Sequence, residues 1–261
     1  MKYLLVLILS LPIKSLSQHK QFKFTGGTTN ITLVTKDSIW MAADSKISSP
    51  AGDSIGLFCK IVHVNNVIYT ISGAYVWIST TLQDTFPTSP DTLFDCYALL
   101  RQILLSTNSI DKCYERFNEI ATPLLTRVFN LVKNEEGQDD FSKRIDFIFE
   151  IVMAGFNKDS LEYKCWNYTL KNKEGIPYVI STEFPRRFAY PFVHVGGFQD
   201  GIRPKLKENP NYITDGNIKE RLTELIELSI NENSKNVGLP INIIMGYKNG
   251  YKWLTDNKIC N

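Results

Sequence analysis

The amino-acid sequence predicts an α+β protein, because strand-like and helical segments are grouped rather than strictly alternating. Residues 28–73 contain two predicted hairpins, and residues 92–133 carry apolar side chains at helical spacing. Strand-like runs return at 145–197, and a helical segment at 218–230 precedes a closing strand pair at 240–254. This order of strands, helices, strands, helix and strands is the basis of the prediction.

Length and composition place the chain among ordinary globular proteins. Its 261 residues suit one domain, and 43% hydrophobic with 21% charged residues is a normal balance. A formal net charge of +2 is too small to predict binding to nucleic acid or to an anionic membrane surface. We therefore expect neither kind of partner.

Residues 1–17 have the features of a secretory signal peptide. Lys2 provides the charged start, and residues 4–12 form an apolar run that is too short to span a bilayer. Small residues at Ser15 and Ser17 fit a cleavage site. The sequence thus predicts a secreted or periplasmic protein that is free of the membrane once this peptide is removed.

Residues 18–27 follow the predicted signal peptide and are polar except for Phe22 and Phe24. They have two interpretations. One is a short propeptide that is cut off before Thr28, which leaves a single domain at 28–261. The other is an ordinary N-terminal edge strand, in which case Thr28 is never freed.

The first predicted hairpin turns at Lys36-Asp37-Ser38. If the turn centres on Asp37, strand partners have numbers that sum to about 73 or 74. This register places Asp44, at the far end of the second strand, beside Thr28.

The second predicted hairpin has strands at 58–64 and 67–73 and a turn at Asn65-Asn66. Its pairing sum is about 131, which places Gly73 near the start of the strand that carries Lys60. The Ser/Gly/Pro-rich segment 45–57 is expected to be a loop that joins the two hairpins.

The rest of the chain alternates between helical and strand signals. Apolar stripes predict helices at 92–105 and 110–133 that face a sheet, and a charged segment at 134–143 predicts an exposed connection. The remaining predicted elements are strands at 145–155, 162–170 and 192–197, a helix at 218–230, and closing strands at 240–245 and 251–254.

Thr28, Asp44, Lys60 and Gly73 form a coherent set for nucleophilic catalysis. A threonine hydroxyl needs a base, and the α-amine of Thr28 would be that base if the bond after Gly27 were cut. An α-amine titrates near pH ~7.7–8.0, and a nearby lysine disfavours a second positive charge. Asp44 would hold Lys60, and the Gly73 N–H would reach a developing oxyanion without a β-carbon in the way.

Each of these residues also has a purely structural interpretation. A threonine is common in strands, an aspartate in turns and a lysine on surfaces, and Gly73 can mark a β-bulge. The catalytic interpretation therefore depends on the joint match of residue type, order and spacing.

This stretch resembles the proteasome β-subunits, which are threonine-type N-terminal-nucleophile hydrolases. The matching residues are Gly27-Thr28-Thr29, Ala42-Ala43-Asp44-Ser45, Lys60-Ile61 and Ser72-Gly73. The aspartate and the lysine follow Thr28 at the family's spacing, whereas the glycine falls one residue early.

The resemblance implies a fold and a role for each residue. The fold is a four-layer αββα sandwich, in which two antiparallel sheets lie between helices. Thr28 is the nucleophile and, through its amine, the general base. Lys60 tunes the site, Asp44 holds Lys60, and the Gly73 N–H forms the oxyanion hole. The chain would cut itself before Thr28 and would thus be made as a zymogen.

One region both extends the resemblance and departs from it. Residues 237–242 are similar to a segment of proteasome β-chains, and especially of the bacterial proteasome relatives known as Anbu. An aspartate and a serine that support the nucleophile in the family are expected just before Gly238, where Ser234 and Val237 stand with Asn236 between them. The serine expected near Gly197 is also absent, which leaves the activity open.

The predicted substrate pocket is apolar. Phe58 and Val62 alternate with Lys60 along the predicted strand, so the three side chains are expected to share one face. The resemblance adds Ile47, Ile71 and Tyr75 to the wall that holds the residue before the cut bond. A charged side chain would be desolvated there without a partner, so we expect cleavage after small or medium apolar residues.

No cofactor or metal is expected from the sequence. The five cysteines do not have the spacing of a metal site, and His19, His63 and His194 are scattered along the chain. An odd number of cysteines leaves at least one thiol free or paired between chains. Cys96 and Cys113 are on neighbouring predicted helices and can form a disulfide.

Three functions fit these observations. The first is a secreted threonine peptidase, and the second is an amidase of the same fold that acts on a small molecule or a cell-wall amide. Fold and nucleophile do not separate these two. The third is a non-catalytic scaffold or binding protein. The expected partner is a peptide or amide substrate, and a homo-oligomer is expected only by analogy with the family.

Overall fold

The computed structural model describes residues 21–48, 54–80, 92–107, 109–136, 146–157, 160–185, 189–255 and 259–260. The predicted signal peptide at 1–17 lies outside the described residues, as do residues 18–20 of the predicted propeptide. Most of the predicted exposed connection at 134–143 also lies outside them, and its first three residues continue a helix.

The described chain is a mixed α+β protein whose strands pair antiparallel, as its sequence predicts. One five-stranded sheet has the order β12-β11-β10-β7-β6. Its strands are β6 (Ile61–Val64), β7 (Val67–Gly73), β10 (Phe147–Asn157), β11 (Ser160–Lys173) and β12 (Ile176–Glu183).

A second five-stranded sheet has the order β13-β2-β3-β14-β15. Its strands are β2 (Thr29–Val34), β3 (Ser38–Ala43), β13 (Phe192–Gly197), β14 (Asn242–Tyr247) and β15 (Gly250–Trp253). Two smaller sheets contain β1 (Gln21–Thr25), β8 (Val76–Thr80) and β9 (Thr92–Asp95), and β4 (Lys46–Ser48) with β5 (Ser54–Leu57).

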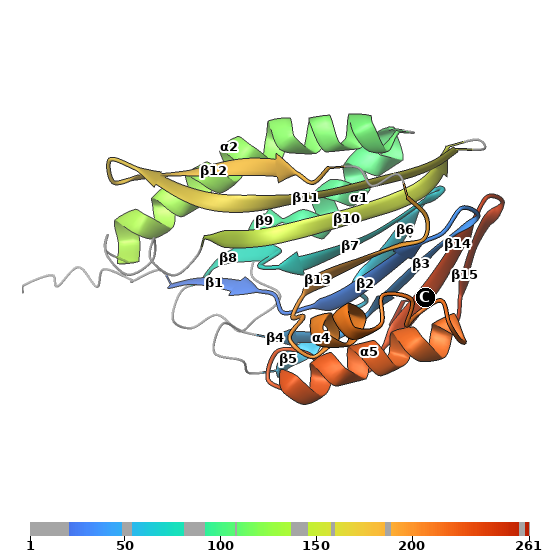
Figure 1. Cartoon of the computed structure of the whole chain (residues 1–261). Coiled ribbons are helices and arrows are strands. Elements are labelled where there is room, and N and C mark those ends of the chain that lie inside the picture. Colours follow the sequence, from blue (N-terminus) through green and yellow to red (C-terminus); the bar gives the residue numbers. More distant parts are fainter. Residues whose placement is uncertain are drawn as a thin grey trace, which may run out of the picture.

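The helices cover the outer faces of the two large sheets (Figure 1). Their bounds are α1 (Cys96–Ser106), α2 (Ile110–Glu136), α4 (Ile202–Glu208) and α5 (Ile218–Glu232). Figure 1 shows α1 and α2 on the sheet that contains β10, and α4 and α5 on the sheet that contains β2. None of the described helices is long and apolar enough to cross a membrane.

Three apolar clusters fill the spaces between these layers. One joins α1 and α2 to the first sheet, a second joins α5 to the other sheet, and a third lies between the two sheets. Strand β7 shows how its sequence serves two clusters, because successive side chains point to opposite faces. Ile68 packs between the sheets, whereas Tyr69 and Ile71 pack under the helices.

Both predicted hairpin registers are confirmed. Asn30 pairs with Ala43 in the first hairpin, which is the expected sum of 73. Ile61 pairs with Thr70 in the second, which is the expected sum of 131. Asn65 has a φ of 54° in its turn, a conformation that asparagine tolerates better than most residues.

Several predicted boundaries are wrong. The segment 45–57 is not only a loop, because β4 and β5 form at its two ends. The first helix begins at Cys96 rather than at residue 92, since the Asp95 side chain caps it by accepting the Ala98 N–H at 3.0 Å. Strand β12 and helix α4 were not predicted, and β6 is shorter than expected.

Cys96 and Cys113, which the sequence allows to form a disulfide, do not form one. Both thiols are free and buried, as is Cys165. The disulfide instead joins Cys59 to Cys260, whose Cα atoms are 5.0 Å apart. These two cysteines are separated by 201 residues, so their meeting depends on where the C-terminal segment returns to the fold.

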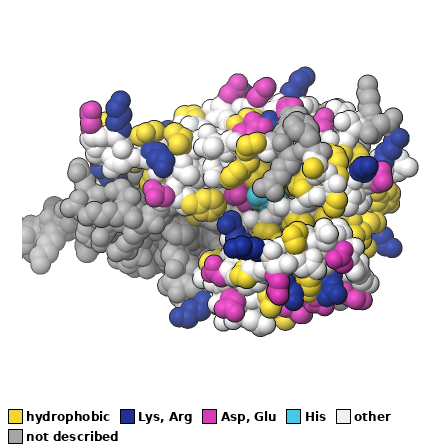
Figure 2. Space-filling model, in the orientation of Figure 1, with side chains coloured by type: hydrophobic (Ala, Val, Ile, Leu, Met, Phe, Trp, Pro, Cys, Tyr) yellow, Lys and Arg dark blue, Asp and Glu magenta, His cyan; other side chains and the backbone are white. Residues whose placement is uncertain are grey.

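Acidic and basic side chains are mixed over the face of the molecule seen in Figure 2, without a large area of one sign. This distribution agrees with the small net charge of +2.

We expect the Cys59–Cys260 disulfide to contribute substantially to stability, because it restricts a very long loop in the unfolded chain. Cys260→Ser should lower the free energy of unfolding by about 2–5 kcal/mol, measured by urea unfolding. Reductant should destabilise the wild-type protein by a similar amount and leave Cys260→Ser unchanged. A non-reduced peptide map that links Cys96 to Cys113 would contradict the assignment.

Candidate active site

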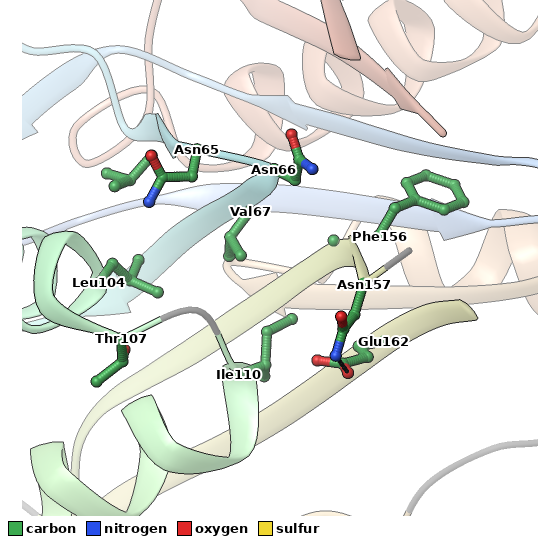
Figure 3. Close-up of a pocket in the computed structure, with 11 residues that line it drawn as sticks. Asn65, Asn66, Val67, Leu104, Thr107, Ile110, Phe156, Asn157 and Glu162 are labelled. Carbon is green, nitrogen blue, oxygen red and sulfur yellow. Dashed lines mark hydrogen bonds between the residues drawn. The ribbon is translucent and has the colours of Figure 1, made fainter. Parts of the chain in front are cut away.

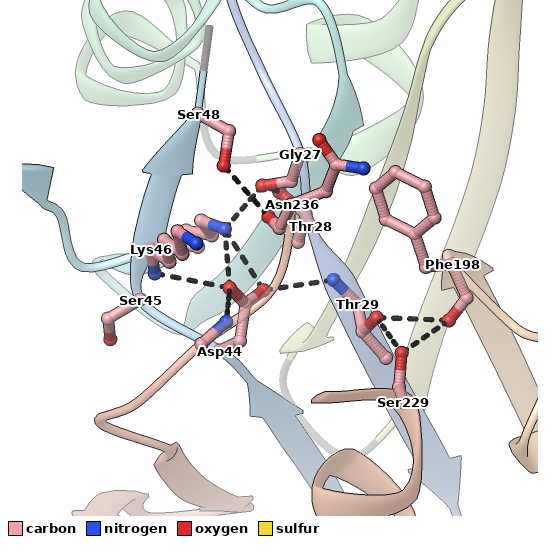
Figure 4. A network of polar contacts seen from close by, with 12 residues as sticks. Gly27, Thr28, Thr29, Asp44, Ser45, Lys46, Ser48, Phe198, Ser229 and Asn236 are labelled. Atoms are coloured by element: carbon pink, nitrogen blue, oxygen red, sulfur yellow. Dashed lines mark hydrogen bonds and ion pairs between the residues drawn. The ribbon is translucent and has the colours of Figure 1, made fainter. Parts of the chain in front are cut away.

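Two of the predicted catalytic residues, Thr28 and Lys60, meet at the carbonyl oxygen of Gly27. Figure 4 shows Gly27 and Thr28 close to Asp44. The Thr28 hydroxyl donates to the Gly27 oxygen at 2.7 Å, and the Lys60 ammonium also donates to it. Thr28 is only 1% exposed, and Lys60 is completely buried. The structure therefore brings the predicted nucleophile, the predicted lysine and the bond before Thr28 into contact.

Asp44 holds Lys60 in this position. The Lys60 ammonium lies 2.8 Å from Asp44 Oδ2, and both side chains are inaccessible to solvent. The carboxyl also accepts N–H groups from Thr29 at 2.9 Å, Lys46 at 3.1 Å and Gly238 at 3.2 Å. Because donors occupy both oxygens, the arrangement fits an ionised carboxylate, which only accepts hydrogen bonds.

Burial acts on the pKa of both members of this pair. It lowers the pKa of the Lys60 ammonium, and the charge and hydrogen bond of Asp44 oppose this shift. It also raises the pKa of the Asp44 carboxyl, against the effects of Lys60 and of the Thr29 and Gly238 N–H groups. The charged Lys60 ammonium polarises the Gly27 carbonyl. Because its pKa is lowered, it can also give up its proton more easily than an exposed lysine.

Strand ends position the pair. Asp44 directly follows β3, where its N–H donates to Thr29 O at 3.3 Å across the first hairpin. Lys60 directly precedes β6, next to the disulfide-bonded Cys59. The prediction that Phe58, Lys60 and Val62 alternate along one strand is wrong, because β6 begins only after Lys60.

Gly27 has a conformation and a position that favour glycine. Its φ is +81°, and a β-carbon there would lie 2.7 Å from the carbonyl oxygen of Asn236. The preceding Gly26 pairs with Ser48 through two backbone hydrogen bonds of 3.3 and 3.2 Å. The chain before Thr28 therefore runs as an extended segment beside β4.

Gly73 packs against Gly26, in the segment that precedes Thr28. A β-carbon on Gly26 would be 2.2 Å from the Gly73 carbonyl oxygen. Gly73 itself has a φ of +105°, and its own β-carbon would meet the Ile148 carbonyl oxygen at 2.4 Å. Close packing of β7 on β10 thus explains the glycine, and the oxyanion role of its N–H stays a prediction.

Sequence reasoning missed Ser229, on α5. Its hydroxyl lies 2.5 Å from the Thr29 hydroxyl, and both hydroxyl oxygens are 3.0 Å from the Phe198 carbonyl oxygen, so one hydroxyl can donate to the carbonyl and the other to its neighbour. A buried serine on an otherwise apolar helix face was the available signal. This contact ties the residue after Thr28 to α5.

The residues that stand where the family's supporting aspartate and serine are expected contact the site mainly through their backbone. The Ser234 carbonyl accepts a hydrogen bond of 2.6 Å from the Lys46 ammonium, and the Asn236 carbonyl accepts one of 3.2 Å from the Ser48 hydroxyl. Val237 is completely buried, just before the Gly238 N–H that reaches Asp44. A backbone contact carries no side-chain signature, so the sequence alone could not show it.

Four of the five predicted pocket residues belong to the apolar cluster under α1. Ile71 and Tyr75 are buried in it, and Phe58 and Val62 pack against it. Ile47, on β4, is not among the side chains that pack there.

Tyr97, on α1, connects two of the predicted pocket residues to the charged pair and was not predicted. Its ring lies 5.0 Å from Phe58 and 5.2 Å from Tyr75, and its hydroxyl donates to Lys60 O at 3.0 Å. The Tyr75 hydroxyl is buried without a hydrogen-bond partner among the described residues. Burial, helped by the negative charge of Asp44, raises its pKa.

A separate pocket of about 160 Å³ lies at the far end of β7 from Gly73 (Figure 3). It is lined by the β6–β7 turn, the facing ends of α1 and α2, and the ends of β10 and β11. None of the predicted active-site residues lines it.

No protein-family model matches the chain, and a search of curated proteins finds no match. The functional argument therefore depends on the residues and their geometry.

Removing one member of the buried pair should destabilise the fold. Asp44→Ala should lower the free energy of unfolding by about 3–5 kcal/mol, because it leaves the Lys60 ammonium buried without its counter-charge. Urea unfolding measures the difference, and Asp37→Ala, in the exposed first hairpin turn, is the matched control. A loss below about 0.5 kcal/mol for Asp44→Ala, as for an ordinary surface change, would contradict the account.

Proposed function

We propose that this chain is a secreted, threonine-type N-terminal-nucleophile hydrolase that cuts peptide or amide bonds after freeing Thr28. One observation carries the proposal: the Thr28 hydroxyl and the Lys60 ammonium meet at the Gly27 carbonyl oxygen. A hydroxyl beside a carbonyl that is already polarised by a cation is well placed for intramolecular attack.

The first step of the proposal is self-cleavage. Thr28 Oγ1 attacks the Gly27 carbonyl carbon, and Lys60 stabilises the negative charge that develops on the carbonyl oxygen. The C–N bond then breaks as the nitrogen takes the hydroxyl proton, which leaves an ester between Gly27 and Thr28. Water hydrolyses this ester, and the products are a carboxylate on Gly27 and a free α-amine on Thr28.

The freed amine is the base for turnover of other substrates. The positive charge of Lys60 lowers the pKa of the neighbouring amine, so that more of it is neutral and able to take the hydroxyl proton. The Thr28 oxygen attacks the carbonyl carbon of the substrate, and the substrate C–N bond breaks as the leaving amine takes the proton from the α-ammonium. Water then hydrolyses the ester on Thr28 and releases the acyl part as a carboxylic acid. The Gly73 N–H would stabilise the oxyanion of each tetrahedral intermediate.

The segment before Thr28 supports a precursor. Thr28 is buried while this segment is attached to it, and Gly26 pairs with Ser48, so we infer that the segment occupies space that a substrate would need. Residues 21–25 form β1, which is the edge strand that the alternative interpretation expects, and β1 pairs only with β8 among the described strands. A cut after Gly27 would detach this segment from Thr28 and uncover the site beside Ser48.

The arrangement of the layers supports membership in the proteasome-like family. Two antiparallel sheets with helices on their outer faces agree with the four-layer αββα sandwich that the resemblance implies. The Cys59–Cys260 disulfide supports secretion, because such bonds persist mainly in oxidising compartments. A buried ion pair costs desolvation free energy, so its presence favours an active site over a plain scaffold.

Hydrolysis of fluorogenic peptide amides tests the proposal. The purified wild-type protein should cleave them, and Thr28→Ala should lose at least about 10³-fold of kcat/KM because no other hydroxyl can replace its function. Thr28→Ser keeps a hydroxyl and should retain measurable turnover. Thr214→Ala changes an exposed threonine and is the control. Equal activity in Thr28→Ala would contradict the mechanism.

The same assay tests the substrate class. Peptides with small or medium apolar residues before the cut bond should react fastest, because the proposed pocket residues Phe58, Ile71 and Tyr75 belong to or pack against an apolar cluster and offer no counter-charge to a charged side chain. Phe58→Ala should shift the preference towards larger apolar residues, and Leu105→Ala, at an exposed position on α1, should not. A preference for basic or acidic residues would contradict the assignment of the pocket.

A further inference from the structure

Three potential metal ligands from three strands converge between the two large sheets. They are Glu150 on β10, Cys165 on β11 and His194 on β13. His194 Nε2 lies 2.9 Å from Glu150 Oε1 and 3.8 Å from Cys165 Sγ. All three ligand atoms are within 4.8 Å of one another.

The cluster is largely enclosed. Glu150 is 8% exposed and Cys165 is 1% exposed, while the His194 side chain retains 20% of its accessible surface. Glu150 and Cys165 come from one sheet and His194 comes from the other. Buried acidic residues are rare unless they are paired or bind a metal, and the nearest partner of the Glu150 carboxylate is the His194 ring, at 2.9 Å.

The geometry does not fit a Cys–His–Glu catalytic triad. In a triad, the nucleophile contacts one ring nitrogen of the histidine and the carboxylate contacts the other. Here the thiol and the carboxylate both face Nε2. Three side chains whose ligand atoms all face one another within 4.8 Å instead have the arrangement of a metal site.

The donor set suits Zn²⁺. Zinc is bound by cysteine thiolate at about 2.3 Å, histidine nitrogen at about 2.0–2.1 Å and carboxylate oxygen at about 2.0–2.2 Å. In a tetrahedron these lengths place neighbouring ligand atoms roughly 3.3–3.6 Å apart. The separations of 2.9 Å and 3.8 Å lie on either side of that range, so small side-chain rotations would complete the geometry.

Asn30 provides an independent indication of a ligand at this place. It is completely buried on β2, and neither amide atom has a hydrogen-bond partner among the described residues. A β-carbon on Gly196 would lie 2.5 Å from Glu150 Oε1, 2.8 Å from Asn30 Nδ2 and 2.9 Å from Asn30 Oδ1. The Asn30 amide therefore points towards the cluster, where a bound water would satisfy it.

A surface pocket gives access to the cluster. It has a volume of about 170 Å³, and His194 forms part of its wall. The other residues that line it are Tyr163, Phe184, Pro185, Phe192 and Val193. A metal ion can therefore reach the histidine without unfolding of the sheets.

We propose that Glu150, Cys165 and His194 bind one Zn²⁺ ion, with a water that Asn30 hydrogen-bonds in the fourth position. Binding displaces the Cys165 thiol proton to solvent and forms one bond from each side chain to the metal. The ion joins β13 to β10 and β11 and so ties the two sheets together. This proposal does not depend on the hydrolase proposal.

Titration of the full-length protein with Co²⁺ and Zn²⁺ tests the site. After removal of metal with a chelator, Co²⁺ should give a thiolate-to-cobalt absorption band with a stoichiometry of one ion per chain, and Zn²⁺ should displace it. Cys165→Ser should abolish the band, and His194→Ala and Glu150→Gln should weaken binding by at least about 10-fold. Cys113→Ser removes another buried free thiol and should leave the band unchanged.

Asn30→Ala is a second variant that tests the same site without removing a metal ligand. It breaks no hydrogen bond among the described residues and should weaken metal binding by about 10–100-fold. Circular dichroism confirms that each variant is folded. Thr28→Ala should bind metal as the wild type does, so loss of hydrolysis and loss of metal binding are separable. A wild-type protein without the cobalt band, or a band that survives in Cys165→Ser, would overturn the proposal.

Discussion

The ion pair between Lys60 and Asp44 is the interaction on which the candidate active site depends. Removing each of two charges from water costs several kcal/mol of free energy, so a buried ion pair is tolerated only when further hydrogen bonds satisfy both groups. Asp44 obtains these bonds from the N–H groups of Thr29, Lys46 and Gly238, which belong to β2, β4 and the segment before β14. The same network directs the Lys60 ammonium onto the Gly27 carbonyl. One buried carboxylate thus connects fold stability to the bond that we propose is cut.

The sequence predicted the parts of this site that depend on short-range pairing. Asp44 and Lys60 are each placed by a hairpin whose turn residues fix the register, and both registers are confirmed. Contacts between distant segments were not predictable in this way. The Cys59–Cys260 disulfide and the Ser229 hydroxyl beside Thr29 depend on the order of strands and helices in space. No local pattern encodes that order.

The two proposed sites share strands β2 and β13. Asn30 lies two residues after Thr28, and Gly196 pairs with it across the two strands. Gly197 then packs against Thr28, since a β-carbon there would lie 1.7 Å from the Thr28 carbonyl oxygen. The expectation of no metal followed from the scattered histidines, and only the sheet topology brings His194 to Glu150 and Cys165. A metal ion on β13 would therefore restrain the strand that supports the nucleophile.

The N-terminal sequence and intact mass of the purified protein test the central claim most directly. The account predicts that the mature wild-type chain begins at Thr28, because only cleavage there gives the hydroxyl its own amine as a base. It also predicts that Thr28→Ala keeps residues 18–27 and begins at Gln18. A mature wild-type chain that begins at Gln18, or a Thr28→Ala chain that is cut at the same bond, would contradict it.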